Sequence, residues 1–451
     1  MSKRPNFCTH VTMLERCFKL QAEGTTVNRE VLAGLTTFAA MAYILVVNPI
    51  ILHAGGKTGL ELAGLISVTA LAAALGCFLM AALTNYPIAQ APGMGINSYF
   101  ASVVVVGMGV PWEGALAMVF WNGIIFLILS ISGIRKAIIQ SLPNCMQIGI
   151  QCGIGFFIAF IGLKNANIIV DNPFTLVSEG DILKPAPLMA LGGLLIMSAL
   201  TVRKFPGAII VTIILLTILG LLIPSGDGTI TEKPDGFFGL PASMGQTFLA
   251  LDWLYPFRHW QTALPVVITL LIIDLFDSLG TLIGLGRQSG LMNEKGEMPR
   301  LNRALTADAL ATIGGALFGT STTTAYIESA TGIEAGGRTG LTSVVVGCCF
   351  LLALFFTPVL TIVPAAATAP ALIMVGLFMA QGLKHINYRD LLEVAPAILT
   401  ALLIPLSFSI THGIMAGIIF YVLLMALVGR AREVTIGAWL IAAVFVGFAL
   451  L

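Results

Sequence analysis

The stretch Leu270–Gly286, LLIIDLFDSLGTLIGLG, indicates an apolar helix that carries two carboxylates, Asp274 and Asp277. A helix repeats every 3.6 residues, so the spacing predicts that both carboxylates share one face with Ser278 and Thr281. A carboxylate at the centre of a bilayer costs about 2.5–3.5 kcal/mol on insertion scales. This face is therefore expected to contact protein, water or a ligand.

A second stretch has the same character. Ser321–Ala330, STTTAYIESA, is uncharged except for Glu328. Carboxylates accept hydrogen bonds, so two of them on different segments suit a flat heterocycle that is rich in N–H donors. We interpret the two stretches as two walls of one binding site.

The composition places the whole chain in a membrane. Apolar residues make up 57% of the 451 residues and charged residues only 10%. A soluble domain of this size does not need so much apolar surface. The net charge of +1 gives no indication of nucleic-acid binding, and the seven cysteines have no metal-ligand spacing. We therefore expect an all-α polytopic membrane protein with no cofactor and no metal.

Hydropathy predicts fourteen membrane segments. They cover residues 30–52, 60–83, 88–107, 113–131, 140–163, 186–202, 206–224, 262–286, 303–319, 322–335, 339–358, 364–383, 391–410 and 412–429. A further apolar piece, Thr435–Leu451, is barely long enough to span, and its status stays open.

The basic residues fix an orientation for these segments. With the N-terminus in the cytoplasm, eighteen of the 23 Lys and Arg lie inside. The five outside are Lys57, Lys164, Lys184, Lys233 and Arg258. This split follows the positive-inside rule. The two longest external loops, about 164–185 and 225–261, are expected to be ordered caps or flexible connectors.

Seven segments in each half predict an inverted repeat, because the second half then enters the membrane from the opposite side. A short sequence similarity between the two halves supports it. Ile96-Asn97-Ser98 in segment three matches Ile327-Glu328-Ser329 at the corresponding position of segment ten. Pro, Gly and β-branched Thr precede both triplets and disfavour helix. Segments three and ten are thus expected to begin extended and to become helical near mid-membrane, which is tolerated where a cavity is lined.

Among the candidate ligand contacts, Asp277 ranks first and Glu328 second. Asp274, one turn from Asp277, fits a ligand contact and a structural network equally well. Asn97 offers both a donor and an acceptor, and the site and scaffold interpretations are equal.

Other polar residues are weaker candidates. Thr37 in segment one either contributes to the site or bonds its own backbone. Tyr326 either stacks on a ring or packs. Asp308 is expected to be an internal hydrogen-bond partner, and Glu30 is expected at the membrane interface.

Burial favours the protonated form of a carboxyl group. Asp274, Asp277 and Glu328 are therefore candidates for proton coupling. Carboxylates also bind Na⁺, so sodium coupling stays open but is less favoured.

Several motifs, in one order, resemble the AzgA-like purine permeases of the nucleobase–ascorbate transporter superfamily. They are VLAGLTTFAAMAYILVVNP, APGMGINSYFA, DLFDSLGTLIG, TAYIESATGIEAGGRTGLT and VPAAATAPALIMVG, and the resemblance runs from about Met13 to Arg432. Ser278 stands where many members carry Thr, which leaves substrate preference open.

The resemblance implies a seven-plus-seven inverted-repeat fold with core and gate domains, and with short strands in segments three and ten that cross near mid-membrane. Residues 1–29 would form a cytoplasmic segment and 431–451 a C-terminal segment. The core would comprise 30–131 and 262–358, and the gate 132–225 and 359–430. The core would move against the gate like an elevator, often in a dimer.

The resemblance also implies a function and a set of contacts. The family imports adenine, guanine or hypoxanthine across the plasma membrane, usually with protons. The base would be held by Asp277 and Tyr326-Ile327-Glu328, with Asn97 as a polar position in segment three. We add Thr37, Ser278 and Asp274 as further substrate-binding candidates.

Two other functions were weighed against this one. An anion transporter of the same fold should place Arg or Lys at the site, and this chain places carboxylates there. An intramembrane enzyme should carry a catalytic motif, and no HExxH or GxSxG set lies in a span.

Overall fold

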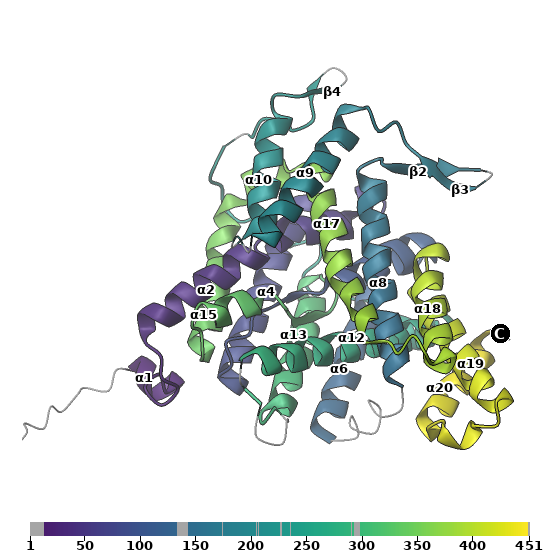
Figure 1. Cartoon of the computed structure of the whole chain (residues 1–451). Coiled ribbons are helices and arrows are strands. Elements are labelled where there is room, and N and C mark those ends of the chain that lie inside the picture. Colours follow the sequence, from purple (N-terminus) through teal and green to yellow (C-terminus); the bar gives the residue numbers. More distant parts are fainter. Residues whose placement is uncertain are drawn as a thin grey trace, which may run out of the picture.

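The computed structural model describes residues 13–449 except 133–142, 174, 204, 206, 226–227, 235, 290 and 293–297. Figure 1 shows a helical bundle in which the small β-hairpins lie at one end and the N-terminal helix α1 (Met13–Phe18) lies toward the other. Nine helices in these ranges are long and apolar enough to cross a membrane.

Every one of the fourteen predicted segments contains a helix. The first half comprises α2 (Val27–Met41), α3 (Ile44–His53), η1 (Ala54–Gly56), α4 (Leu62–Thr84), α5 (Met94–Ser98), the π-helix η2 (Tyr99–Gly107), α6 (Trp112–Ser132), α8 (Asn144–Asn165), α9 (Pro185–Val202) and α10 (Ala208–Gly220). The second half comprises α11 (Tyr255–Arg258), α12 (Trp260–Ser289), α13 (Leu301–Phe318), α14 (Ser329–Glu334), α15 (Gly340–Ala353), η3 (Leu354–Phe356), α16 (Thr357–Thr361), α17 (Ala365–Ala380), η4 (Gln381–His385), α18 (Leu391–Leu406) and α19 (Ile410–Leu427). The chain continues with η5 (Ala431–Glu433) and α20 (Ile436–Ala449). At 1.5 Å per residue, α20 is about 21 Å long and shorter than the hydrocarbon core of about 30 Å.

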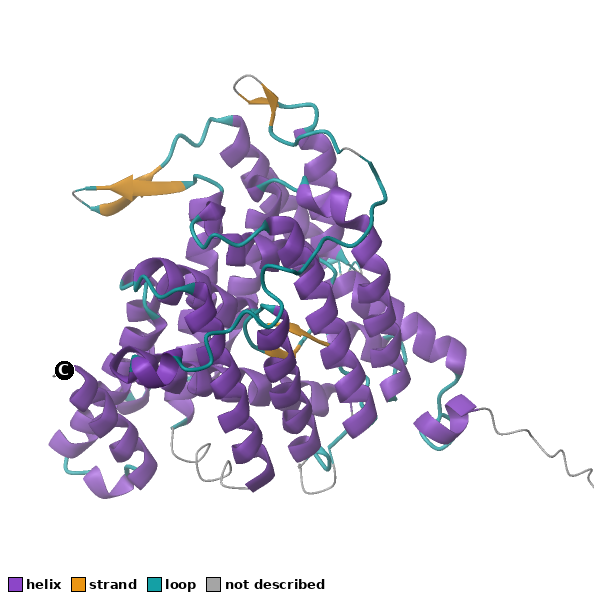
Figure 2. Ribbon diagram, turned by 180° about the vertical axis from the view of Figure 1, so that it is seen from behind, coloured by secondary structure: helices purple, strands orange, loops and turns teal. Residues whose placement is uncertain are grey.

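The expected breaks in segments three and ten are confirmed. Strand β1 (Gln90–Pro92) pairs antiparallel with β6 (Thr323–Ala325), with Ala91 opposite Thr324. Figure 2 shows this short pair in orange, enclosed by helices. Gly76 on α4 permits the close approach, because a Cβ there would lie 2.8 Å from the Gln90 Cβ. The antiparallel pairing is the relation that the expected inverted repeat requires.

The helices pack in two groups. In one, α4 packs on α13 and α15, α6 packs on α13, and α2 packs on α15. In the other, α8 packs on α17 and α18, and α9 packs on α10 and α17. The first group lies within the expected core ranges and the second within the expected gate ranges. Their roles as moving and fixed parts stay a prediction.

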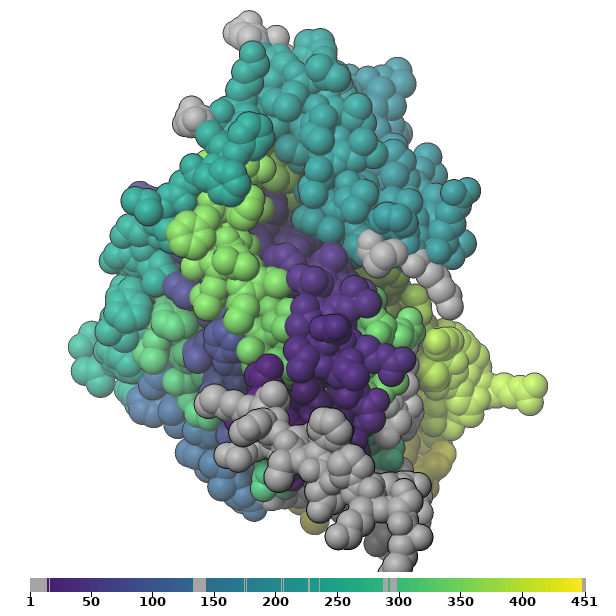
Figure 3. All heavy atoms as spheres, turned by 90° about the vertical axis from the view of Figure 1, so that its left-hand side faces the viewer, coloured from purple at the N-terminus to yellow at the C-terminus, as the bar shows by residue number. Residues whose placement is uncertain are grey.

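Apolar side chains on the outer surface fit a bilayer environment. Leu32 and Leu35 on α2 and Leu352 on α15 are all exposed. Figure 3 shows this face, where purple α2 lies beside the green chain of the second half.

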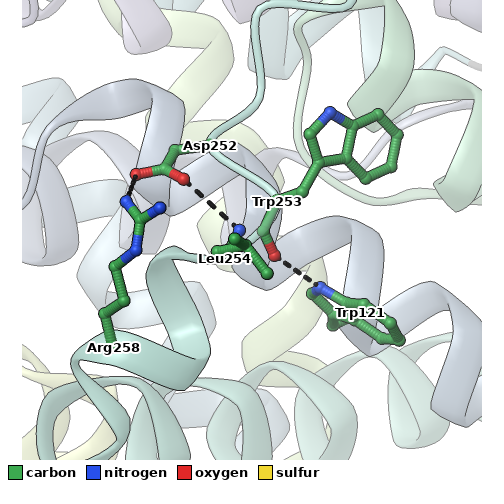
Figure 4. Close-up of polar contacts among 5 residues, drawn as sticks. All are labelled: Trp121, Asp252, Trp253, Leu254 and Arg258. Atoms are coloured by element: carbon green, nitrogen blue, oxygen red, sulfur yellow. Dashed lines mark hydrogen bonds and ion pairs between the residues drawn. The ribbon is translucent and has the colours of Figure 1, made fainter.

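Residues 252–258 of the loop before α12 pack against the middle of α6 (Figure 4). The Trp121 indole Nε1–H donates to the Trp253 carbonyl over 3.1 Å. Asp252 accepts from the Leu254 amide over 3.3 Å and pairs with Arg258 at 3.5 Å. The exposed ion pair contributes little. Edge-to-face ring contacts, Phe120 with Trp253 at 4.8 Å and Trp121 with Phe257 at 5.1 Å, also hold these residues on α6.

The other external loop carries two strands. Strand β2 (Ile169–Asn172) pairs with β3 (Leu176–Glu179). A further short pair joins β4 (Pro224–Ser225) to β5 (Gly228–Thr229) just after α10.

Glu30, expected at the membrane interface, lies in the first turn of α2. Its side chain is fully buried and accepts four hydrogen bonds from the chain that begins α15. The donors are the amides of Arg338, Thr339 and Thr342 and the Thr342 hydroxyl, which lies 2.6 Å away. Glu30 therefore joins the first segment to the eleventh, a contact that hydropathy does not reveal.

Replacing Glu30 by Ala should destabilise the fold, because several buried donors lose their acceptor. We expect a loss of about 2–4 kcal/mol, seen as a lower thermal unfolding temperature in detergent. Glu61→Ala, at an exposed residue, is the control. An unchanged unfolding temperature for Glu30→Ala would contradict this anchor.

Candidate functional site

A cavity of about 450 Å³ lies between the two groups of helices. One side is formed by α12 together with the strand and helix starts of segments three and ten. The other side is formed by α8, α17 and the start of η4. The stretches Leu270–Gly286 and Ser321–Ala330 both contribute to its wall, as two walls of one site require.

The wall from α12 presents one stripe of the helix. Ile273, Asp277, Gly280 and Thr281 line the cavity. These positions recur at the spacing of one helix face. Asp277 is only partly buried, so its carboxylate is accessible from the cavity.

The expectation of one shared face for all the polar residues of α12 is wrong. Asp274 and Ser278 are fully buried on the neighbouring stripe. Asp274 accepts from the Asn122 amide of α6 over 3.2 Å, and the Ser278 hydroxyl lies 3.0 Å from that of Thr324. A helix turns by 100° per residue, which is enough to move i+1 neighbours from the cavity into the protein.

The wall from segment ten carries the second carboxylate. Tyr326, Ile327 and Glu328 line the cavity where β6 passes into α14. The Tyr43 hydroxyl donates to Glu328 Oε1 over 2.6 Å and so orients the carboxylate. The Tyr326 hydroxyl donates to the Pro92 carbonyl over 2.6 Å, so its polar end is engaged with β1 and its ring borders the cavity.

The opposite wall is apolar with two amide side chains. Its apolar residues are Ile154, Ile158, Val375, Phe378 and Met379. Gln151 of α8 and Gln381 of η4 add polar groups that the sequence analysis did not single out. The available signal was the polar Gln151 inside the otherwise apolar run 148–158.

Two expected contacts lie outside the cavity wall. Asn97 is fully buried, donates to the Asn48 side chain and accepts from the Ser321 hydroxyl. It thus ties segments one, three and ten together behind the strands. Thr37 is fully buried where α2 packs on Gly332 of α14, and a Cβ on that glycine would clash with the Thr37 hydroxyl. Their roles toward a ligand stay predictions.

The cavity combines hydrogen-bond acceptors with apolar walls. Two partly buried carboxylates, Asp277 and Glu328, face it, and among the described residues no Lys or Arg lines it. Neither carboxylate forms an ion pair within the described ranges. Apolar walls with a few convergent polar groups are typical of small-molecule sites.

The family profile and the similar proteins agree that the chain is a permease. The sequence profile described as "Permease family" (Xan_ur_permease) matches residues 28–428. The adenine permease AdeP of Escherichia coli K12 is 42% identical over 434 residues, which cover 96% of this chain and 95% of the relative. The guanine/hypoxanthine permease PbuG of Bacillus subtilis 168 is 40% identical over 427 residues, or 92% and 95% of the two chains. The putative permease MJ0326 of Methanocaldococcus jannaschii is 43% identical over 437 residues, or 97% of both.

Solved structures share the fold. The transmembrane domain of the cyanobacterial bicarbonate transporter BicA superposes with a TM-score of 0.65 at 17% identity, covering 86% of this chain and 97% of that one. The structure of SLC26A9 superposes with a TM-score of 0.63 at 14% identity, covering 92% and 67%. At such identities the likeness concerns fold alone, and it confirms the fold class expected from the sequence.

The division of α12 into a cavity stripe and a buried stripe predicts different access to thiol reagents. In a cysteine-free background, Thr281→Cys should react with a small maleimide at least ~10-fold faster than Ser278→Cys, because only an accessible thiolate reacts. Mass spectrometry of the labelled protein measures both rates. Equal rates would place the two residues in the same surroundings and contradict the cavity described here.

Proposed function

We propose that this chain, which belongs to the Permease family and to the nucleobase–ascorbate transporters within it, imports a purine nucleobase by secondary active transport. It is a multi-pass membrane transporter and not an enzyme. The substrate is adenine or guanine/hypoxanthine, in keeping with the names of the relatives AdeP and PbuG.

One observation carries the choice of substrate class. Asp277 and Glu328 face the same cavity from different segments. A purine presents ring and exocyclic N–H donors along its edges and an apolar face. Carboxylates on one wall and Ile, Val and Phe on the other match both features.

The same geometry disfavours an anion as substrate. BicA, whose fold is similar, is a bicarbonate transporter by its title. In this chain the cavity wall holds two carboxylates and no basic side chain. An anion in this cavity would meet charges of its own sign, at a cost that grows in a low-dielectric site.

A second cavity supports alternating access. It measures about 460 Å³ and is lined by Ser102 and Val106 of η2, Ile161 and Asn165 of α8, and the start of α17. The first cavity is lined by other parts of α8 and α17, and by the start of α5 in place of η2. With the N-terminus in the cytoplasm, as the basic residues favour, the first cavity faces inward and the second faces outward. We infer an inward-open state with an elevator-like motion of the first group of helices against the second.

A buried hydrogen bond joins the expected core and gate ranges. The hydroxyls of Tyr99 on η2 and Thr411 on α19 lie 2.6 Å apart, and both residues are buried. Along the chain, Tyr99 lies between Ile96 of the first cavity and Ser102 of the second. We infer that this bond is part of the outer seal and breaks when the outer cavity opens.

Coupling to protons completes the proposal. Carboxylates removed from water favour protonation, and the candidates are Asp274, Asp277 and Glu328. Sodium is the less favoured alternative. The proposed location is the bacterial inner membrane with a cytoplasmic N-terminus, and the proposed assembly is a homodimer.

Loss of either cavity carboxylate should abolish transport. We expect Asp277→Ala and Glu328→Ala to lower labelled-purine uptake at least ~10-fold, because a hydrogen bond to a charged group contributes roughly 1.5–3 kcal/mol. Uptake is measured in cells stripped of their own permeases, with competition by each base and with membrane insertion checked by blotting. Asp252→Ala in the external loop is the control. Normal uptake in both variants would rule out this site.

Removing the proposed seal should shift the protein toward the outward-open state. Tyr99→Phe deletes one hydroxyl and about 0.5–1.5 kcal/mol, which corresponds to a shift of roughly 2–10-fold. In a cysteine-free background, labelling of Thr281→Cys, which lines the first cavity, by an impermeant maleimide added outside should therefore speed up. Thr411→Val should act likewise, whereas Thr212→Val, whose hydroxyl bonds only its own helix over 2.8 Å, should not. If Tyr99→Phe and Thr411→Val label at the parental rate, the bond does not seal the outer side.

A further inference from the structure

Two carboxylates outside the cavity wall form a second acidic group. Asp274 of α12 and Asp308 of α13 are both fully buried. The two helices that carry them contact each other. Asp308 was expected to be an internal hydrogen-bond partner, and the Gln90 amide of β1 does donate to it.

The hydrogen bonds around this pair do not balance. Asp274 accepts one bond, from Asn122, through Oδ2. Asp308 accepts from Gln90 through Oδ1, and the Ser278 hydroxyl and the Ala325 amide are further donors near it. Asp274 Oδ1 and Asp308 Oδ2 have no partner, and neither do the amide oxygens of Gln90 and Asn122. All four atoms are acceptors without a donor, and all four residues are fully buried. A buried acceptor left unpaired costs about 1–3 kcal/mol, more when it is charged.

The charges around the pair do not balance either. Asp277, three residues after Asp274 on α12, adds a third carboxylate at the cavity. No residue of the described ranges forms an ion pair with Asp274, Asp277 or Asp308. Two ionised carboxylates at this depth would face an uncompensated charge of −2, which proteins avoid.

We propose that Asp274 and Asp308 together bind the transported proton, with Asn122 and Gln90 as positioning residues. The proton comes from water on the outer side, adds to one carboxylate oxygen as an O–H donor, and returns to water on the inner side. It supplies one O–H donor among the orphaned oxygens, it removes one negative charge, and it needs no added volume.

This arrangement separates the ion from the substrate. The purine meets Asp277 and Glu328 in the cavity, and the proton sits behind the strands, where Gln90 belongs to β1 itself. Coupling follows from charge, because a core that carries one negative charge fewer crosses the membrane at lower cost. The inference rests on the proposed purine transport and assigns its coupling site.

The test compares driven uptake with exchange in proteoliposomes. Asp308→Asn and Asp274→Asn keep the shape of the carboxyl group and fix it as neutral. Each should reduce purine uptake driven by an inward proton gradient at least ~10-fold, while counterflow at equal pH stays within roughly threefold of wild type. Asp277→Asn is the comparison, because a substrate contact should lose both activities.

The outcomes distinguish failure of the proposed purine transport from failure of the proposed proton site. Absence of purine counterflow in the wild-type protein would refute the proposed function itself. If the wild-type protein shows counterflow and both Asn variants keep proton-driven uptake, only the coupling site is overturned. Uptake driven by a sodium gradient and not by a proton gradient, lost in the same variants, would overturn the proton assignment.

A milder variant covers the case in which neither Asn variant folds. Asn122→Ala keeps both carboxyl groups and removes the one donor to Asp274. The ionised form loses a stabilising bond, so the pH midpoint of driven uptake should move to higher pH by at least about half a unit with counterflow unchanged. An unmoved midpoint would overturn the assignment.

Discussion

A carboxylate inside an apolar bundle must find hydrogen-bond donors, a countercharge or a proton, and this requirement organises the structure. Glu30 meets it with four protein donors at the start of α15. Asp277 and Glu328 meet it at a cavity where a ligand can supply donors. Asp274 and Asp308 meet it only in part, since each keeps one orphaned oxygen. The three solutions correspond to anchoring, to proposed substrate binding and to proposed coupling.

The antiparallel pair of β1 and β6 brings these groups together. It is only three residues long, yet it places Gln90 against Asp308 and the start of α14 against the cavity. Broken helices of this kind are stable only where other protein groups satisfy the freed backbone. Here the Tyr326 hydroxyl and the buried Asn97 amide hold the two breaks in place. The same local irregularity thus positions a wall of the cavity and the buried carboxylates behind it.

Much of this arrangement was predictable from the chain. Apolar runs of membrane length gave the segments, and Pro, Gly and Thr before Asn97 and Glu328 gave the breaks. Hydropathy is averaged along the sequence and holds no information on contacts between segments. It therefore could not show that Glu30 reaches the eleventh segment or that Gln151 faces the cavity. The shared face assigned to Asp274 and Asp277 failed because three residues along a helix leave a 60° offset, which is enough to separate a cavity wall from a buried interface.

The central claim is that Asp277 and Glu328 hold the donor edges of a purine. An experimental structure of the protein with bound adenine or guanine tests it most directly. The account predicts density for the base in the cavity between α12 and the β6–α14 junction, with N–H groups within hydrogen-bond distance of both carboxylates. A base bound elsewhere, with both carboxylates contacting only protein, would contradict it.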